Sequence, residues 1–278
     1  ISRSIERTLH YGRRYFMVCP EYFTVKVPLT PEGYLAVRTL RQEGVPINFT
    51  LGFSVRQNYL AARLANPDFV NVFLGRLNQV VMDHNAGTGE LVGEKVTLAT
   101  QQALRSAREN DKHVSSRLIA ASIRNGEQVA FLAGLDVLTI PPKAMKDYQD
   151  SGKLPDQVVS HIDDSIEPGV DPQHRFAKRF SELWQLSEEF RNFVDALVAR
   201  PDLDSMQGEE LDKIARDVNL FHPFSEDDLN KIQEHGKIPD LNAWPDSVAL
   251  DDLMTQSALQ SFTKDQNALD ERIRSFLK

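Results

Sequence analysis

The sequence predicts a parallel α/β fold, arranged as part of a barrel and followed by a helical extension. Up to Pro142, short apolar runs alternate with stretches whose apolar residues recur every three or four positions, a pattern typical of strands alternating with helices. The centres of three successive runs, Val25, Phe49 and Asn71, are 24 and 22 residues apart, which is a compact unit length. After residue 142 no convincing strand pattern remains. We therefore expect a barrel portion over residues 1–150 and an α-helical region over 151–278 packed on it.

Six apolar runs are expected to be strands. In chain order they are residues 1–6, 23–29, 47–53, 69–75, 115–122 and 137–141. Helical spacing fills residues 31–44, 54–65 and 95–110, and again two long amphipathic stretches, 174–200 and 250–278. Ser225, followed three residues later by Asp228, predicts a capped helix start in the C-terminal region.

Composition excludes several classes of function. The chain has 40 acidic and 32 basic residues, a net charge of −8, which argues against a nucleic-acid partner. A single cysteine fits a reducing, cytoplasmic setting, and no apolar run approaches the roughly 18 residues of a membrane span. His84, His113 and His161 show no metal-ligand spacing and are expected at the surface. Because the chain starts at Ile1 and not at a methionine, we expect further sequence upstream.

Side chains alternate across a strand, so each predicted strand has two faces. One face is apolar throughout, as in Val25 and Val27 of the run 23–29. The other face carries polar residues: Lys26, Asn48, Thr50, Asn71, Ser122 at the end of the run 115–122, and Arg124 just beyond it. In that run we place Ile119 and Ala121 on the apolar face, opposite Ser122. Because a doubly wound sheet would bury apolar residues on both faces, the pattern favours a barrel with polar groups inside it.

Lys26 is the unusual residue of this scheme. Burying an ammonium group costs several kcal/mol unless something compensates. Inside a barrel, desolvation would lower the pKa of Lys26, and its neutral amine would be a nucleophile for a carbonyl carbon, as in a Schiff base. The alternative is an edge-strand lysine that points into water. Alternation alone does not choose between them.

Five segments, in this order, resemble the transaldolase family, a group of Schiff-base aldolases on an (α/β)8 barrel of the TIM type. They are VKVP with PEG (25–33), INFTLGFS (47–54), VFLGRLN (72–78), AASIRN (120–125) and AGLDVLTIPP (133–142). The resemblance covers residues 1 to about 150 and implies this barrel, here apparently lacking its N-terminal strands. It also implies an enzyme that needs no metal and no cofactor, because the iminium itself is the electron sink.

The resemblance assigns roles residue by residue. It implies Lys26 as the Schiff-base lysine, with Asn48 and Thr50 orienting the bound dihydroxyacetone unit and a catalytic water. Arg76, Ser122 and Arg124 would bind a sugar phosphate, for which forked guanidinium groups are well suited. In the alternative reading, the arginines bridge loop carboxylates and the polar residues of the second strand are satisfied inside a barrel layer.

Phe73 and two departures from the family pattern bear on the reaction. Phe73 matches a phenylalanine that distinguishes the transferases of this family from aldolases with a tyrosine there, although an inward aromatic can simply fill a barrel. Asn71 replaces a serine and can still donate a hydrogen bond to a substrate hydroxyl. The opening segment resembles the third family strand, but Ser4 occupies the place of a glutamate that passes protons through the water.

These points predict a cytoplasmic transaldolase of the pentose phosphate pathway. It would transfer a dihydroxyacetone unit from sedoheptulose 7-phosphate or fructose 6-phosphate to an aldose phosphate. The alternatives are an aldolase that uses free dihydroxyacetone and a non-catalytic sugar-phosphate-binding relative, which Ser4 favours. We expect sugar phosphates as partners, and neither nucleic acid nor a membrane. The C-terminal helices could close the barrel bottom, cover the active site or form a homodimer, and their periodicity does not choose among these.

Overall fold

A single parallel sheet organises the protein. The computed structural model describes residues 2–277, and in this part of the chain five strands are hydrogen-bonded in their sequence order. They are β1 (Val25–Pro28), β2 (Ile47–Thr50), β3 (Phe69–Phe73), β4 (Arg117–Ala121) and β5 (Val137–Leu138). Consecutive parallel strands joined through helices are the arrangement of a TIM-type α/β fold, so the predicted fold class is confirmed.

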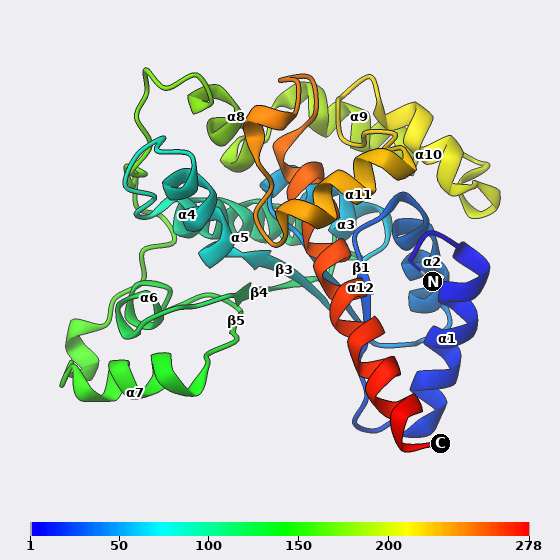
Figure 1. Cartoon of the computed structure of the whole chain (residues 1–278), viewed down its shortest axis with the longest axis horizontal. Coiled ribbons are helices and arrows are strands. Elements are labelled where there is room, and N and C mark those ends of the chain that lie inside the picture. Colours follow the sequence, from blue (N-terminus) through cyan, green and yellow to red (C-terminus); the bar gives the residue numbers. More distant parts are fainter. Residues whose placement is uncertain (1, 278) are drawn as a thin grey trace.

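Helices surround and follow this sheet (Figure 1). Those of the sheet region are α1 (Ile5–Val18), α2 (Pro31–Gln42), α3 (Val55–Leu64), α4 (Leu74–Asp83), α5 (Val92–Asn110), α6 (Gly126–Phe131) and α7 (Pro142–Asp150). Those that follow are η1 (Pro155–Gln157), α8 (Ala177–Ser181), η2 (Glu182–Trp184), α9 (Glu188–Val198), η3 (Leu203–Ser205), α10 (Gly208–Ala215), α11 (Glu226–His235), η4 (Leu241–Ala243) and α12 (Leu250–Phe276). Ser225 caps α11 in a capping box with Asp228, as the sequence predicts.

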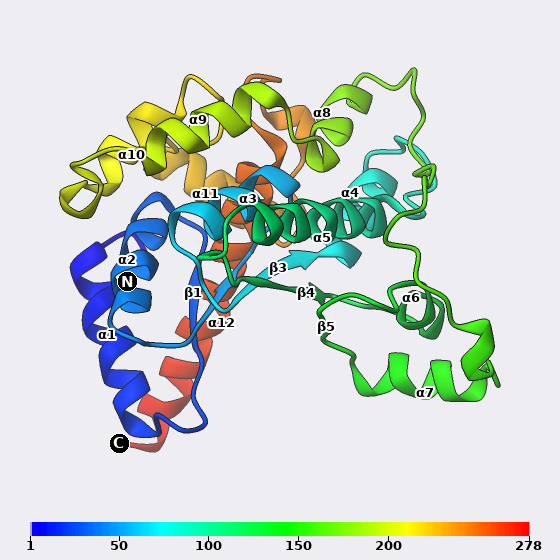
Figure 2. The same ribbon diagram turned by 180° about the vertical axis from the view of Figure 1, so that it is seen from behind.

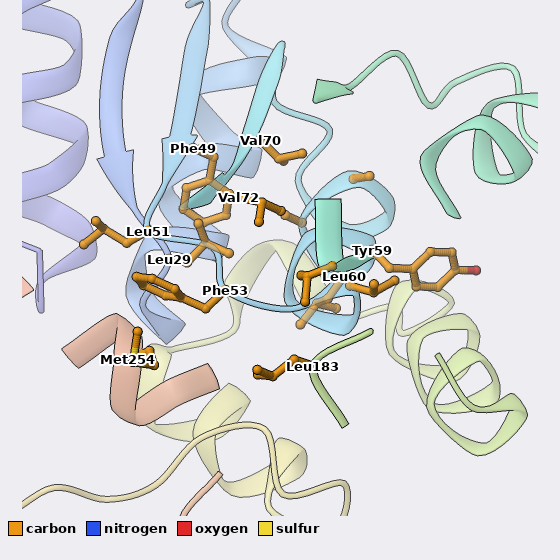
Figure 3. Close-up of a cluster of buried hydrophobic side chains, with 14 of the residues drawn as sticks. Leu29, Phe49, Leu51, Phe53, Tyr59, Leu60, Val70, Val72, Leu183 and Met254 are labelled. Carbon is orange, nitrogen blue, oxygen red and sulfur yellow. The ribbon is translucent and has the colours of Figure 1, made fainter. Parts of the chain in front are cut away.

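The apolar face of the sheet forms the core together with the helices that cover it. Alternate residues of β2 and β3, such as Phe49, Val70 and Val72, have no exposed surface, and α3 contributes Leu60 to the same cluster (Figure 3). Met254 of α12 also belongs to it. Apolar burial of this kind is the main favourable contribution to folding. The core therefore joins the C-terminal helices to the sheet.

Helix α12 lies on the other side of the sheet from α3 and α5. In Figure 1 it crosses in front of β1, whereas in Figure 2, seen from behind, α3 and α5 are in front and α12 lies behind the sheet. The polar face of the sheet therefore looks toward α12. How the chain divides into domains at residue 150 stays a prediction.

The expected strand over residues 1–6 is wrong. Residue 1 lies outside the described residues, residues 2–4 form no strand, and α1 begins at Ile5. Ser4 is the N-cap, and its Oγ accepts a hydrogen bond from the Arg7 N–H at 3.2 Å. A serine side chain at this position satisfies a backbone donor that the first helical turn leaves free. The local cap therefore outweighs the short apolar pattern.

The face assigned to Ile119 and Ala121 is also wrong. In the parallel pairing of β3 with β4, Asn71 is opposite Ile119 and Phe73 is opposite Ala121. Residues paired in this way point to the same side of a sheet, so Ile119 and Ala121 share the polar face. Ser122 has a φ of 68° and has already left the strand, so its side chain does not mark the face of the residues before it. Alternation does not extend through such a turn.

Candidate active site

Lys26 lies on the polar face of β1. Its neighbours Val25 and Val27 are buried on the opposite face, which fixes the direction of the lysine. Lys26 itself is exposed, so the expected enclosure is wrong, because β1 is an edge strand of the described sheet. Partial burial nevertheless lowers the pKa of its ammonium. Its Nζ lies 5.8 Å from the centre of the Phe262 ring of α12.

Two asparagines continue this face across the next two strands. Asn48 of β2 is the register partner of Lys26, and Asn71 Nδ2 donates a hydrogen bond to Asn48 Oδ1 at 3.0 Å. The structure thus brings together three predicted site residues on three adjacent strands. Asn48 keeps its amide donor available, since the bond to Asn71 uses only its oxygen.

Thr50 ends β2 on the same side, and its hydroxyl lacks a hydrogen bond. The residue is 3% exposed, and Thr50 Oγ1 has no partner within residues 2–277. A buried hydroxyl without a partner is costly and rare. Both Thr50 and Lys26 line a cavity of about 420 Å³, whose wall is completed by Tyr11 of α1 and by Phe262 of α12. Its lining, within the described residues, includes no carboxylate.

Two arginines extend the site beyond β3. Arg76 of α4 is 8% exposed, and its Nη1 has no hydrogen-bond partner in the described part of the chain. Burial, followed by the positive charge of Arg124, lowers the pKa of the Arg76 guanidinium, while Asp265 of α12 opposes this shift. The guanidinium carbon lies 5.7 Å from the Phe73 ring and 6.0 Å from the Phe262 ring. Two neighbouring cations with an unused donor form a site suited to an anion.

The close approach of α4 to the end of β4 depends on Gly75. A Cβ at this position would lie 2.3 Å from the Ser122 carbonyl oxygen and 2.6 Å from Arg124 Nε. Ser122, with its positive φ, turns the chain there, and Arg124 follows on an exposed loop. Gly75 therefore allows α4, which carries Arg76, to touch the loop that carries Arg124. The predicted polar residues after β3 and β4 are thus adjacent.

Not every predicted site residue lines the cavity. Asn48, Asn71, Arg76, Ser122 and Arg124 are absent from its lining, so the cavity reaches only the Lys26 and Thr50 end of the site. Ser4 is also absent, because its hydroxyl caps α1. Arg76 and Arg124 lie further along the sheet, beyond β3.

Sequence reasoning missed Phe262, which contacts the site from α12. No local pattern distinguishes this phenylalanine from other apolar positions of a long helix, because its role depends on a contact with residues some 200 positions away. The surface prediction for His84 is wrong as well: its side chain is 6% exposed, and its Nε2 accepts a hydrogen bond from the Leu241 N–H at 2.8 Å. That contact also joins residues far apart in the sequence.

No group of three or more histidine, cysteine, aspartate or glutamate side chains within residues 2–277 is arranged to hold a metal ion. None of the helices described is both long enough and apolar enough to cross a membrane.

Comparison with known proteins gives a consistent result. A family model described as "Transaldolase/Fructose-6-phosphate aldolase" matches residues 1–199. Proteins named "Probable transaldolase" are similar to this chain: that of Parvibaculum lavamentivorans is 38% identical over 44% of this chain and 50% of its own length. That of Thermus thermophilus is 38% identical over 49% and 54%, and that of Exiguobacterium sibiricum is 35% identical over 51% and 59%. The chain thus spans about half the length of the curated relatives it matches.

Proposed function

This chain belongs to the transaldolase/fructose-6-phosphate aldolase family, and we propose that it transfers a dihydroxyacetone unit between sugar phosphates through a Schiff base on Lys26. The observation that carries the proposal is the alignment of Lys26, Asn48 and Asn71 on one face of three adjacent strands. The lowered pKa of Lys26 supports it, because only the neutral amine attacks a carbonyl carbon.

The reaction begins with attack of Lys26 Nζ on the C2 carbonyl of a ketose phosphate. The carbinolamine loses water to give an iminium ion, which accepts the electron pair when the C3–C4 bond breaks. An aldose phosphate leaves, and an enamine of dihydroxyacetone stays on the lysine. A second aldose phosphate then takes up this unit through a new C–C bond, and hydrolysis frees Lys26. In this proposal the Asn48 amide and the Thr50 hydroxyl orient the substrate hydroxyls and a water molecule; the free Asn48 amide group and the unpaired Thr50 Oγ1 support these roles.

The phosphate group would bind at the other end of the site. Arg76 supplies an unpaired buried Nη1, and Arg124 adds a second positive charge nearby. The half-buried Phe73 offers no hydroxyl to assist the release of free dihydroxyacetone, which favours transfer to an acceptor over simple cleavage. The proposed partners are therefore two sugar phosphates, and a pentose phosphate interconversion in the cytoplasm is the setting that fits them.

A non-catalytic sugar-phosphate binder is the second candidate. The observation that favours it is the absence of a carboxylate from the described lining of the Lys26 cavity, since such a group would move the protons of the reaction. A binder would keep affinity for the phosphate through Arg76 and Arg124 and form no covalent adduct. The two candidate functions therefore differ in whether a covalent adduct forms on Lys26.

Borohydride trapping with fructose 6-phosphate, followed by peptide mass mapping, tests the proposal. We expect a reduced adduct on Lys26 and none in the Lys26→Met variant. Lys178→Met, at a fully solvated lysine outside the site, is the control and should trap as the unmodified protein does. A folded protein that binds the sugar phosphate but gives no adduct would contradict the Schiff-base mechanism and leave the binder.

A further inference from the structure

The two arginines of the anion site need something to hold them together. Their like charges repel, and neither forms an ion pair with a carboxylate of the described residues within 4.0 Å. Arg124 is exposed and lies in the loop after β4, whereas Arg76 belongs to α4. Without a connection between these two elements, the repulsion would favour movement of the loop.

A chain of three buried or partly buried hydrogen bonds supplies this connection. Asn78, two residues after Arg76 in α4, donates from Nδ2 to Glu94 Oε2 at 3.0 Å. Glu94 Oε1 accepts from Gln128 Nε2 at 2.7 Å, and Gln128 Oε1 accepts from the Arg124 N–H at 2.7 Å. Four side-chain and backbone groups, from α4, α5, α6 and the loop, are thus linked without a break.

Burial and neighbouring backbone contacts hold this chain of hydrogen bonds in place. Glu94 is 3% exposed and Gln128 is 7% exposed. The Gly93 N–H donates to Asn78 Oδ1 at 2.6 Å, and a Cβ on Gly93 would lie 2.2 Å from the Leu74 carbonyl oxygen. The first turn of α5 therefore packs directly against the first turn of α4. Asn78, Glu94 and Gln128 also line a separate cavity of about 510 Å³ that none of the predicted site residues touches.

Donors and acceptors along these hydrogen bonds can be assigned in only one way. A backbone N–H can only donate, so the amide of Gln128 must present its oxygen to Arg124 and its NH₂ to Glu94. The Glu94 carboxylate, an acceptor at both oxygens, then receives both amides. Replacing the Glu94 carboxylate by an amide would therefore place two NH₂ donors opposite each other, either at Asn78 or at Gln128.

We propose that Glu94 and Gln128 are positioning residues that hold the Arg124 loop against α4, so that Arg76 and Arg124 together bind a single phosphate group. The inference rests on the proposed function for the identity of the ligand. It goes beyond it in assigning affinity for the phosphate to two residues that touch neither the substrate nor the guanidinium groups. Their effect should be confined to the phosphorylated end of the substrate.

The first test is the Glu94→Gln variant of the full chain. We expect the dissociation constant for fructose 6-phosphate, measured by titration calorimetry, to rise about tenfold, the size of one lost charge-assisted hydrogen bond. KM for the phosphorylated ketose should rise by a similar factor with kcat unchanged. Trapping of unphosphorylated dihydroxyacetone should proceed at the unmodified rate, because that ligand does not reach the arginines.

An exchange of the two side chains provides the rescue. In the double variant Glu94→Gln and Gln128→Glu, the Arg124 N–H donates to a carboxylate at position 128, which also accepts from the amide at position 94. Asn78 Nδ2 then donates to the oxygen of that amide. Every hydrogen bond of the chain is restored, so affinity for fructose 6-phosphate should return to within about twofold of the unmodified protein. Glu127→Gln, at an exposed neighbour in the same cavity, is the matched control and should change nothing.

Several results would overturn the inference. Equal loss of affinity for phosphorylated and unphosphorylated ligands would mean a general structural role, and so would a double variant no better than the single one. Unchanged phosphate affinity in Glu94→Gln, or an unmodified protein that binds no phosphate, would also contradict it. A protein that binds fructose 6-phosphate, shows the variant pattern and forms no adduct would contradict the Schiff-base chemistry alone.

Discussion

Two buried polar atoms in the candidate site, Thr50 Oγ1 and Arg76 Nη1, have no hydrogen-bond partner among residues 2–277. Each costs folding free energy, because burial removes water without replacing its hydrogen bonds. Both belong to the residues that the sequence predicts as functional. Sites that bind polar ligands retain such groups, since the ligand supplies the missing partner.

Thr50→Val should separate stability from function. Valine keeps the shape and removes the unpaired hydroxyl, so we expect the free energy of unfolding to be unchanged or to rise by about 1 kcal/mol. The rate of dihydroxyacetone transfer should fall about tenfold or more, because the group that orients substrate and water is lost. Denaturant unfolding and steady-state kinetics measure the two effects.

The matched control is Thr100→Val on α5. Thr100 is equally buried, but its Oγ1 donates to the Val96 carbonyl oxygen at 2.7 Å. This change should leave activity intact and should not stabilise the protein. If Thr50→Val lowered the free energy of unfolding as much as Thr100→Val does, the Thr50 hydroxyl would have a structural partner. Its proposed role in orienting substrate would then fail.

At the scale of single residues, alternation predicted which side chains share a face where the strand is regular. Lys26, Asn48 and Asn71 lie together because each occupies the middle of a strand. Alternation assigned Ile119 to the wrong face, because Ser122 takes a positive φ that periodicity cannot predict. Nor does periodicity identify Gly75, where a Cβ would lie 2.3 Å from the Ser122 carbonyl oxygen.

At the scale of elements, α12 closes one side of the candidate site. Phe262 approaches both Lys26 Nζ and Arg76 Cζ, at 5.8 and 6.0 Å. Asp265, one turn further, acts on Arg76 by its charge. One helix therefore contributes to the environment of both the proposed nucleophile and the proposed phosphate site. Of the three roles that the sequence left open for the C-terminal helices, covering the site is the one that these contacts support.

Phe262→Ala should raise the pKa of Lys26 toward its ordinary value. Desolvation is the cause of the lowered pKa, and removing the ring admits water to the cavity wall. Less neutral amine is then present near neutral pH, so the rate of adduct formation at about pH 7 should fall several-fold and recover at higher pH. The pH dependence of borohydride trapping measures this shift.

Phe276→Ala is the control for this prediction. Phe276 lies on the same helix and is 77% exposed, far from the cavity lining. Its removal should leave the pH profile unchanged. A profile that moved to lower pH in Phe262→Ala would show that attraction between the ring and the ammonium, and not exclusion of water, dominates at Lys26.

The start of a helix was predictable where the sequence contains a recognisable capping motif. Ser225 and Asp228 form the expected capping box of α11. Ser4 is likewise the N-cap of α1. The family resemblance instead predicts Ser4 on a strand, in the place of a glutamate that passes protons. A serine before a helical stretch has a local physical explanation, because its hydroxyl satisfies a free N–H of the first helical turn.

At the scale of the whole molecule, buried polar contacts tie α12 to the sheet region. Asp251 accepts from Arg56 Nε at 2.7 Å and from Ser54 Oγ at 2.6 Å, and Thr255 Oγ1 donates to the Leu51 carbonyl oxygen at 2.9 Å. These partners are about 200 residues apart. Local periodicity cannot predict such pairs, so the helical character of the C-terminal region was predictable and its position over the site was not.

The neighbouring carboxyl, Asp252, makes this junction sensitive to pH. It is 2% exposed, and burial raises its pKa to about 7, with the charge of Asp251 adding to the shift. The backbone N–H of His222 and the charge of Arg56 act in the opposite direction. Between pH 4 and pH 7, Asp252 is protonated in the folded protein and ionised in the unfolded chain. Folding therefore takes up a proton, and this group lowers the free energy of unfolding as the pH rises through that window.

Asp252→Asn removes this titration and should stabilise the protein more at pH 8 than at pH 5. An asparagine can still accept from the His222 N–H, which donates to Asp252 at 2.7 Å. The gain in unfolding free energy over the unmodified protein should grow by at most about 1.4 kcal/mol per pH unit and level off above pH 7. Denaturant unfolding across this range measures it, with Asp227→Asn, at an exposed carboxyl of α11, as the control. A gain that is constant with pH would mean that Asp252 ionises at its ordinary pKa, and that the α12 junction tolerates two buried carboxylates beside Arg56.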